Sequence, residues 1–330
     1  DIDAKIRTEC VEALGTWIWT LPDFFMEPEY LRYLGWMLSD IVPQTRLEVL
    51  KQLARILKRD ASKLGHFIDR FRPRLVEMAT KDADVNVRVA AVSVMQILKG
   101  SGMLEPDEID SVGRLIFDSE LRIRKATVEF FAGCVNDLIE SKVEDLGGDD
   151  AIDEMLGEDP GDDYLSPRRE WIMVKCLAEL LAAYDAQLEE ENKTQSPRGL
   201  DIAVEMVQAA PPETRISMAS QVLFEYVEEV KKWELLAGYL LYDHTTSTKS
   251  KSSSSKKVSS EEALKNAMAP EGKEETVLLE VLVTSVRLSL ASGKQRGDGG
   301  DDDTVVHLAN IMPRLLSKYG AEARTAVPVL

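Results

Sequence analysis

An aspartate followed six residues later by an arginine recurs four times in the first 124 residues of this chain of 330 residues. The arginines of successive pairs lie 39, 42 and 36 residues apart. The four pairs are Asp1/Arg7, Asp40/Arg46, Asp82/Arg88 and Asp118/Arg124. Self-similarity at about this period is typical of proteins built from stacked helix pairs, in which no single unit buries its own apolar face. The repeat therefore predicts an array of helix pairs.

Apolar residues at helical spacing follow the second and third of these arginines. After Arg46 they are Leu47, Leu50, Leu53, Ala54 and Leu57, and after Arg88 they are Val89, Val92 and Met95. Strand signals are almost absent, so the sequence predicts an all-α fold, a HEAT-repeat-like α-α superhelix or solenoid. The aspartate of each pair is expected to cap the free N–H groups of a helix, and the arginine to bind a carboxylate of a neighbouring unit.

The net charge of −18 is distributed unevenly along the chain. The segment from Pro43 to Gly100 holds twelve Lys/Arg and six Asp/Glu, a local excess of +6, so the remainder carries −24. A basic segment within an acidic protein is a marked charge asymmetry, which makes the segment a candidate for a binding surface.

Cysteine usage and hydropathy narrow the class of protein. Cys10, Cys134 and Cys176 lie far apart in helical apolar patterns, as expected for reduced thiols of an intracellular protein. No apolar run approaches the roughly eighteen residues that a membrane-spanning helix needs, so no membrane contact is expected. No signal peptide is recognisable, and because Asp1 already belongs to a repeat, we interpret the chain as a fragment of a longer protein.

Composition divides the chain into helical repeats and two inserts. Residues 144–163 contain ten Asp/Glu and no Lys/Arg, and residues 243–274 include runs of Ser and Lys. Neither stretch has enough apolar residues to offset the entropy of ordering, so both are predicted to be disordered. The serines are either phosphorylation targets or part of an inert surface loop. The predicted order is helical repeats at 1–140, an acidic insert at 141–166, helical repeats at 167–242, a Ser/Lys-rich insert at 243–274, and helical repeats at 275–330 with a Gly/Asp loop at 293–303.

No set of residues in the sequence assembles into an active site. His66, His244 and His307 are dispersed, without Cys or carboxylate at the spacing of metal ligands. The glycine pairs at 147–148 and 299–300 lie in acidic segments that would repel a phosphate. We therefore expect a protein that is not an enzyme, holds no cofactor and no metal, and works through binding surfaces.

Two predicted helices carry aromatic and basic residues on one side. Arg32 and Trp36 lie four residues apart and share a side that the expected core leucines do not. The second helix carries Phe67, Arg70, Phe71 and Arg74 at i, i+3, i+4 and i+7. Corresponding helices of adjacent units line one face of a solenoid, so an aromatic-basic groove is expected, suited to a short peptide with aromatic anchors among acidic residues. The alternative is that Trp36 and Phe71 are ordinary core residues.

A basic stripe follows spacings of four, three and one residues along a single helix. It consists of Lys51, Arg55, Lys58 and Arg59. This face is expected to contact double-stranded DNA through its phosphates without reading base sequence. The alternative is a solvated helix face without a partner.

Several motifs in the first 50 residues stand in the order and spacing of a known domain. They are Ile6-Arg7, Leu14-Gly15-x-Trp17, Tyr30-Leu31-Arg32-Tyr33-Leu34-Gly35-Trp36, Asp40 and Arg46-Leu47. Together they resemble the stromalin conservative domain, which marks the stromal antigen (stromalin) subunit of cohesin. The resemblance is specific over about residues 1–76, and the rest of the chain resembles more loosely the helical repeats of that family. The two inserts are interpreted as specific to a lineage, here a fungal one.

The resemblance implies a non-catalytic subunit scaffold that binds the kleisin subunit of cohesin and helps to load the ring onto DNA. It implies roles in sister-chromatid cohesion and chromosome segregation during the cell cycle. The cohesin loader and release factors would be further partners. The implied location is the nucleus and the chromosome, including the centromere.

The resemblance also assigns residues by position. The family's surface for shugoshin-type regulators with short aromatic motifs falls on Arg32, Tyr33, Trp36, Phe67, Arg70 and Phe71. This moves Trp36 from the expected core to the expected site, and Arg32 stands where the family more usually has Lys. Family DNA contacts match Lys51 and Arg70, so Arg70 is a candidate for either DNA or the peptide, and the sequence does not separate the two. With the basic stripe, the candidate DNA-binding residues are Lys51, Arg55, Lys58, Arg59 and Arg70.

Two other classes of helical-repeat protein are alternatives to this interpretation. A karyopherin-like transport adaptor would carry ladders of Trp and Asn on an inner face, and the five tryptophans of this chain form no such ladder. A regulatory scaffold of a phosphatase or kinase would leave the motif from Tyr30 to Trp36 unexplained.

Overall fold

The computed structural model describes residues 3–157, 166–195, 213–244, 260–296 and 300–321. All regular secondary structure in these ranges is helical, which confirms the all-α prediction. The chain divides into two compact units, Asp1–Cys134 and Val135–Leu330, so that the division falls a few residues before the predicted boundary at 140. No helix among the described residues is long and apolar enough to cross a membrane.

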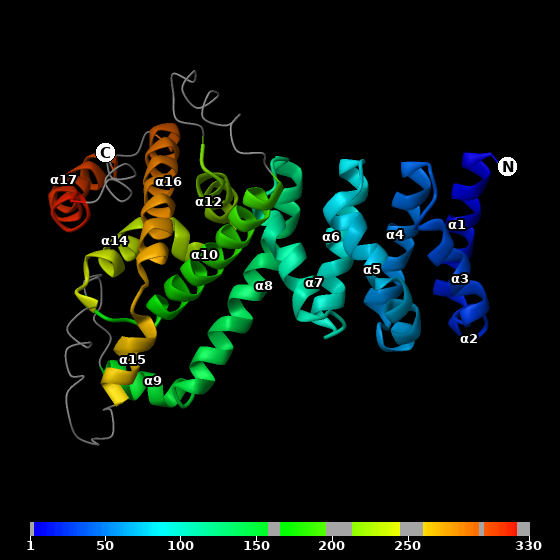
Figure 1. Ribbon diagram of the computed structural model, residues 1–330, viewed down its shortest axis with the longest axis horizontal. Helices are drawn as coiled ribbons and strands as arrows, with labels where there is room; N and C mark the ends of the chain where they lie inside the picture. Colours follow the sequence, from blue (N-terminus) through cyan, green and yellow to red (C-terminus); the bar gives the residue numbers. More distant parts are fainter. Residues whose placement is uncertain (1–2, 158–165, 196–212, 245–259, 297–299, 322–330) are drawn as a thin grey trace. The chain divides into compact units, whose positions relative to one another are not determined.

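The first unit consists of helix pairs that stack on one another (Figure 1). Helices α1, α4 and α6 pack in succession on one side, and helices α3, α5 and α7 pack in succession on the other, as in HEAT-type repeats. Proline occupies the first position of α2, α3, α4 and α7, where its missing N–H costs no helical hydrogen bond. The elements are α1 (Ala4–Thr20), α2 (Pro22–Phe25), α3 (Pro28–Met37), α4 (Pro43–Arg59), the 3₁₀ turn η1 (Ser62–Leu64), α5 (Gly65–Lys81), α6 (Val85–Gly100), α7 (Pro106–Gly113), the 3₁₀ turn η2 (Arg114–Phe117) and the first part of α8 (Leu121–Asp145).

The arginines of the Asp/Arg repeat bind the aspartate of the next repeat, as the sequence predicts. Arg7 donates to both carboxylate oxygens of Asp40 at 2.6 and 2.9 Å, and Arg46 does the same to Asp82 at 2.8 and 2.6 Å. Arg88 continues the series with a bond to Asp118. Each bidentate pair joins two successive units with fixed geometry, so the repeat in the sequence is a ladder of ion pairs in space.

The aspartates of the ladder differ from the prediction in what they cap. Asp40 accepts the backbone N–H of Val42 at 2.8 Å, and Asp82 accepts that of Asp84 at 3.0 Å. Both acceptors therefore hold the turn before the helix, because Val42 and Asp84 are themselves the N-cap residues of α4 and α6. The prediction that they cap the helix N–H groups is wrong, since the carboxylates are engaged by the arginines of the preceding unit.

Two glycines allow the helices of the first unit to approach closely. A Cβ atom on Gly15 would lie 2.5 Å from Cγ of Gln52, and one on Gly35 would lie 2.1 Å from Cζ of Phe71. The first contact joins α1 to α4, and the second joins α3 to α5. Both glycines belong to the motifs that carry the resemblance, and at both positions the absence of a side chain allows two helices to pack closely.

The second unit is organised around α16, which packs against α10, α12 and α14 (Figure 1). A buried ion pair between Lys175 and Glu274, 2.5 Å apart, links α10 to α16. Trp171 lies in the core against the ring of Tyr239, at a centroid distance of 5.5 Å. The elements are the second part of α8, α9 (Asp149–Leu156), α10 (Glu170–Gln195), α12 (Arg215–Tyr226), α13 (Glu228–Lys231), α14 (Trp233–Leu241), α15 (Ser260–Met268), α16 (Gly272–Arg296) and α17 (Gly300–Tyr319).

The predicted acidic insert at 141–166 is wrong over its first part. Helix α8 continues to Asp145, and α9 follows with Ile152 fully buried and packed towards α15. Asp149 and Asp150 lie in the first turn of α9, where negative charge is favourable to the helix dipole. One buried apolar residue and a favourable terminus thus suffice for a helix in a very acidic stretch, while residues 158–165 lie outside the described residues.

Similar corrections apply to the other predicted loops. Within the predicted Ser/Lys-rich insert at 243–274, α15 buries Leu264 and Met268, and only 245–259 lie outside the described residues. The predicted Gly/Asp loop at 293–303 is mostly helical, because α16 reaches Arg296 and α17 begins at Gly300. Residues 196–212, within the predicted repeats at 167–242, also lie outside the described ranges.

Candidate functional site

Helix α3 presents the first half of the predicted aromatic-basic groove. Leu31 and Leu34 are buried, whereas Trp36 on the opposite side is 51% exposed. The alternative that Trp36 is a core residue is therefore excluded. The aromatic residue Tyr33 lies edge-on to Trp36, with ring centroids 5.4 Å apart. The guanidinium of Arg32 lies 5.2 Å from the ring centre of Tyr33 and 5.7 Å from that of Trp36, within the range of cation–π attraction.

Helix α5 presents the second half of the groove beside α3. The guanidinium of Arg70 is exposed and lies 5.4 Å from the ring centre of Phe71. Phe71 is half-buried, and its ring fills the space that Gly35 leaves on α3. Phe67 is only 7% exposed and stacks under Phe71 at 4.8 Å, so Phe67 supports the surface from below. The structure thus brings the two predicted sets together on adjacent helices.

The two cations of this groove are available for an anionic partner. Arg32 donates a long bond of 3.4 Å to the hydroxyl of Tyr33, and neither Arg32 nor Arg70 forms an ion pair with any carboxylate in the described part of the chain. Arg74, by contrast, pairs with Glu77 at 2.6 Å and donates to the carbonyl of Leu38. Arg74 therefore ties α5 to the end of α3 and takes a structural role in the groove.

The predicted basic stripe lies on the exposed side of α4. Lys51, Arg55, Lys58 and Arg59 are all exposed. Lys51 forms an ion pair with Glu48 at 3.3 Å. The carboxylate partly neutralises the positive charge that Lys51 would present to an anionic ligand. The guanidinium groups of Arg55 and Arg59 lie 4.8 and 5.1 Å from the ring centre of Trp19, a residue that the sequence did not single out. Arg59 also donates to the backbone carbonyl of Trp19.

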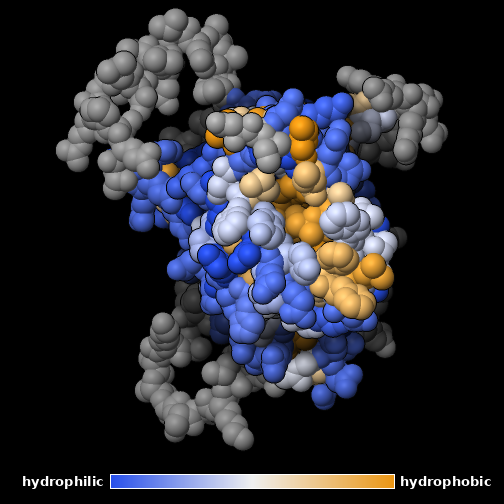
Figure 2. All heavy atoms as spheres, turned by 90° about the vertical axis from the view of Figure 1, so that its right-hand side faces the viewer, coloured by the Kyte–Doolittle hydropathy of each residue, from blue (hydrophilic) through white to orange (hydrophobic). Residues whose placement is uncertain are grey.

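The structure also shows an apolar surface that the sequence did not predict. Trp17 on α1 is 51% exposed and contacts the ring of Phe25 at 5.6 Å, and Phe25 in turn contacts Tyr30 at 5.0 Å. Phe24 beside them is 71% exposed. Figure 2 looks at the end of the first unit where α1 lies and shows apolar side chains gathered there among hydrophilic ones. Trp19, and not Trp17, is the tryptophan of α1 whose ring lies against the arginines of the basic stripe.

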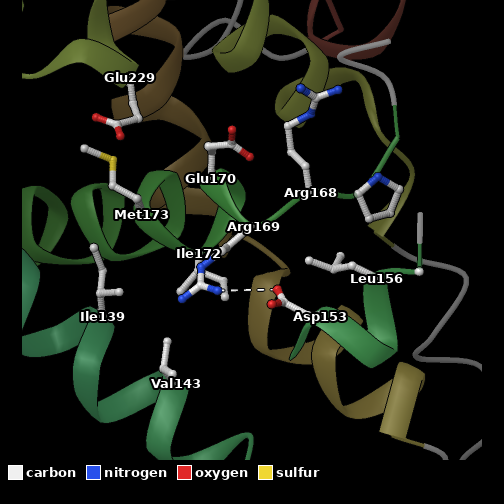
Figure 3. A pocket seen from close by; sticks show the side chains of 12 residues that line it. Ile139, Val143, Asp153, Leu156, Arg168, Arg169, Glu170, Ile172, Met173 and Glu229 are labelled. Atoms are coloured by element: carbon white, nitrogen blue, oxygen red, sulfur yellow. Dashed lines mark hydrogen bonds and ion pairs between the residues drawn. The ribbon is translucent and has the colours of Figure 1, made fainter. Parts of the chain in front are cut away.

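A hollow of about 510 Å³ opens in the second unit between α8, α9 and α10 (Figure 3). Its lining is mixed: Ile139 and Val143 from α8 and Ile172 from α10 are apolar, whereas the other side chains around it include Asp153, Arg168, Arg169, Glu170 and Glu229. Arg169 at its rim pairs with Asp149 and, at 3.4 Å, with Asp153. The charge of this arginine is thus already compensated, so the hollow lacks the free cations of the first unit. In the described ranges no three His, Cys, Asp or Glu side chains are grouped as metal ligands would be.

The tryptophans of the chain do not form the ladder of a karyopherin-like adaptor. Trp171 and Trp233 are buried in the core of the second unit. The other three tryptophans occupy α1 and α3, where two face solvent and one supports arginines.

Comparison with known proteins finds similarity to one domain family and to several proteins of sister-chromatid cohesion. The family model described as the stromalin conservative domain matches residues 1–72. Cohesin subunit psc3 of Schizosaccharomyces pombe is 32% identical over 256 residues, which cover 75% of this chain and 25% of that protein. Sister-chromatid cohesion protein 3 of Arabidopsis thaliana is 34% identical over 131 residues, and cohesin subunit SA-1 of Xenopus laevis is 34% identical over 134 residues; each alignment covers 39% of this chain, and 12% and 10% of those proteins.

A solved structure resembles the whole fold. Cohesin subunit Scc3 from Z. rouxii superposes with a TM-score of 0.64 at 21% identity, over 100% of this chain and 33% of that chain. At this identity the likeness shows the helical-repeat fold alone. The chain spans a quarter or less of the length of the curated relatives described above.

Proposed function

Because this chain matches the stromalin conservative domain and is related to the cohesin subunits psc3 and SA-1 and to sister-chromatid cohesion protein 3, we propose that it is a non-catalytic scaffold segment of a cohesin subunit. In this role it contributes to sister-chromatid cohesion and chromosome segregation, in the nucleus and on chromosomes, including the centromere. Its partners are the kleisin subunit, double-stranded DNA, the cohesin loader and release factors, and regulators that carry short aromatic motifs.

The observation that carries this proposal is the set of exposed aromatic and basic side chains on the adjacent helices α3 and α5. Trp36 is 51% exposed, and neither Arg32 beside Trp36 nor Arg70 beside Phe71 has a carboxylate partner among the residues described. A peptide with an aromatic anchor flanked by acidic residues fits both features, because its ring can pack on Trp36 and Phe71 while its carboxylates pair with Arg32 and Arg70. This is the chemistry of a shugoshin-type short motif.

The kleisin is proposed to bind across several repeats. Stacked helix pairs offer a long continuous surface, and an extended segment that orders on binding needs a wide footprint to offset its lost entropy. Contacts are therefore expected over the helices from about residue 30 to the C-terminal helices. A pull-down of the chain with successive kleisin segments tests this directly, and a chain that captures no segment would contradict the proposal.

Deleting residues 249–259 is expected to leave the affinity for kleisin within about threefold, on the order of 0.6 kcal/mol. A Ser/Lys-rich segment supplies little fixed apolar surface, whereas α15, which begins at Ser260, buries Leu264 and should be kept. Titration of a labelled kleisin segment measures the affinity, and thermal unfolding checks that the variant folds. A tenfold loss in a folded variant would place residues 249–259 in the interface.

DNA binding is proposed for the exposed side of α4. Arg55, Lys58 and Arg59 face solvent without a carboxylate partner in the described part of the chain, and they lie in the basic segment of an acidic protein. Contacts of this kind reach phosphates and not base edges, so binding should be weak, independent of sequence and steeply dependent on salt. Arg70 on α5 is a candidate for either DNA or the peptide.

Replacing Lys51, Arg55, Lys58 and Arg59 together by Glu is expected to abolish binding to duplex DNA. Four phosphate contacts are lost and four repulsive charges are introduced, so the slope of log K against log salt should fall towards zero. The matched control replaces the exposed Lys5, Lys81, Lys232 and Arg287 by Glu, which changes the net charge equally. Fluorescence anisotropy over a salt series measures both variants, and equal losses in the two would show that only net charge matters.

A further inference from the structure

Two arginines of α4 share one aromatic ring. The guanidinium carbons of Arg55 and Arg59 lie 4.8 and 5.1 Å from the ring centre of Trp19, and Arg59 also donates to the carbonyl of Trp19. Like charges four residues apart on a helix repel each other by a few tenths of a kcal/mol. The electron-rich face of the indole offsets this repulsion, so the two cations can be held close together.

The approach of α1 to α4 sets this arrangement. The Gln52 side chain packs against Gly15, and the Thr8 and Thr45 hydroxyls lie 3.0 Å apart along the same contact. Trp19 comes one helical turn after Gly15 and therefore lies on the same side of α1. Because Arg55 and Arg59 come three and seven residues after Gln52, they lie on the matching side of α4. The register of α1 and α4 thus places the guanidinium groups of Arg55 and Arg59 against the ring of Trp19.

The four basic residues of α4 differ in how freely they can meet an anion. Lys51 is partly compensated by Glu48, whereas Arg55 and Arg59 pair with no carboxylate of the described residues. A lysine or arginine free in solvent loses rotamer entropy when it binds a phosphate. Arginines already held against an indole have lost part of that freedom before the ligand arrives.

We propose that Trp19 is a positioning residue of the DNA surface, which fixes Arg55 and Arg59 as a preformed pair of phosphate-binding cations. This inference rests on the proposed binding of duplex DNA by α4. On this proposal the four basic residues of α4 contribute unequally to DNA binding. Arg55 and Arg59 supply most of the binding, and Lys51 supplies the least. It also adds a residue of α1 to a surface whose candidates from the sequence lie on α4 and α5.

The test is a double-mutant cycle on the full chain with a fixed duplex as the probe. Trp19→Leu is expected to weaken DNA binding about fivefold, because two cation–π contacts and the order they impose are lost. Trp19→Phe, which keeps an aromatic face, should stay within about twofold of the wild type. In a background that carries Arg55→Gln and Arg59→Gln, Trp19→Leu should have no further effect, since only arginines that are present can be positioned.

The control is Trp17→Leu, which removes an exposed indole from the same helix at a site near Phe25. It should leave DNA binding unchanged, and thermal unfolding of every variant shows that the fold is retained. If the wild type binds DNA through the arginines but Trp19→Leu binds as tightly, the positioning role is wrong while the DNA surface stands. An equal effect of Trp19→Leu with and without the arginines would also overturn the positioning role. If the wild-type chain binds no duplex DNA at all, the DNA surface and the inference are both wrong.

Discussion

Trp36→Ala is expected to weaken the binding of a short peptide with one aromatic anchor among acidic residues by about 2 kcal/mol or more, or about thirtyfold. The ring of Trp36 is half exposed and forms the platform against which Tyr33 and Arg32 are held. Its loss removes the surface for the anchor and also frees the guanidinium that would pair with the peptide carboxylates. Isothermal titration with a synthetic peptide that carries one Phe flanked by Glu measures the effect.

Trp17→Ala provides a matched control for this experiment. Trp17 and Trp36 are each 51% exposed, but the Trp17 ring lies against Phe25, whereas the Trp36 ring lies against Arg32. Trp17→Ala should therefore leave peptide affinity within about twofold. Neither variant should shift the melting temperature greatly, because neither ring is in the core. A large loss of stability in Trp36→Ala with unchanged affinity would show that Trp36 is structural and not part of the groove.

The ladder of ion pairs could be predicted from the sequence because its period is a property of the chain. The spacing of Asp40/Arg46 and Asp82/Arg88 predicted that each arginine reaches a neighbouring unit, and the bonds from Arg46 to Asp82 and from Arg88 to Asp118 confirm it. The target of the aspartates could not be predicted in the same way. Whether a carboxylate accepts from a helix N–H or from the turn before it depends on one or two residues, here the turn at Val42, that periodicity does not resolve.

The groove could be predicted only in part, because helical spacing identifies a side of a helix but not what that side meets. Spacing placed Arg32 with Trp36, and the structure adds that the side is solvent-exposed. Spacing equally placed Phe67 with Phe71, although Phe67 is buried beneath it. Trp19 had no signal in the sequence, because its partners lie 36 and 40 residues away and meet it only through the packing of α1 on α4.

The inserts show where composition is a poor guide. An acidic stretch was predicted to be disordered because it lacks apolar residues as a whole, yet α9 needs only Ile152 as a buried contact. The average composition of a twenty-residue stretch does not reveal a short helix whose acidic first turn and single buried apolar side chain both favour helix formation. The same holds for α15, in which Leu264 and Met268 are buried within a segment dominated by Ser and Lys.

Arg46→Ala is expected to lower the free energy of unfolding by about 3–5 kcal/mol, the usual cost of removing one partner of a buried ion pair. Arg46 is buried and holds Asp82 with two bonds of 2.8 and 2.6 Å, and it also donates to the carbonyl of Asp40. Alanine would leave a buried carboxylate without its cation and a carbonyl without a donor. Chemical denaturation at neutral pH measures the loss, and Lys63→Ala is the control, because its pair with Asp60 is exposed to solvent and should contribute little to stability.

The same variant should change how stability depends on pH. Burial alone would raise the pKa of Asp82, but the bonds from Arg46 and from the backbone N–H of Asp84 outweigh it, so the pKa is lowered in the folded state. A carboxyl group with a lowered pKa stabilises the fold above its unfolded pKa of about 3.9, and this contribution is lost as pH falls through the lowered value. Wild-type stability should therefore fall as the pH drops below about 4, and this acid-sensitive part should shrink in Arg46→Ala because the cause of the low pKa is gone. Denaturation midpoints measured from neutral pH down to pH 3 test this, and a loss below about 1 kcal/mol with an unchanged acid dependence would mean that the ladder does not stabilise the first unit.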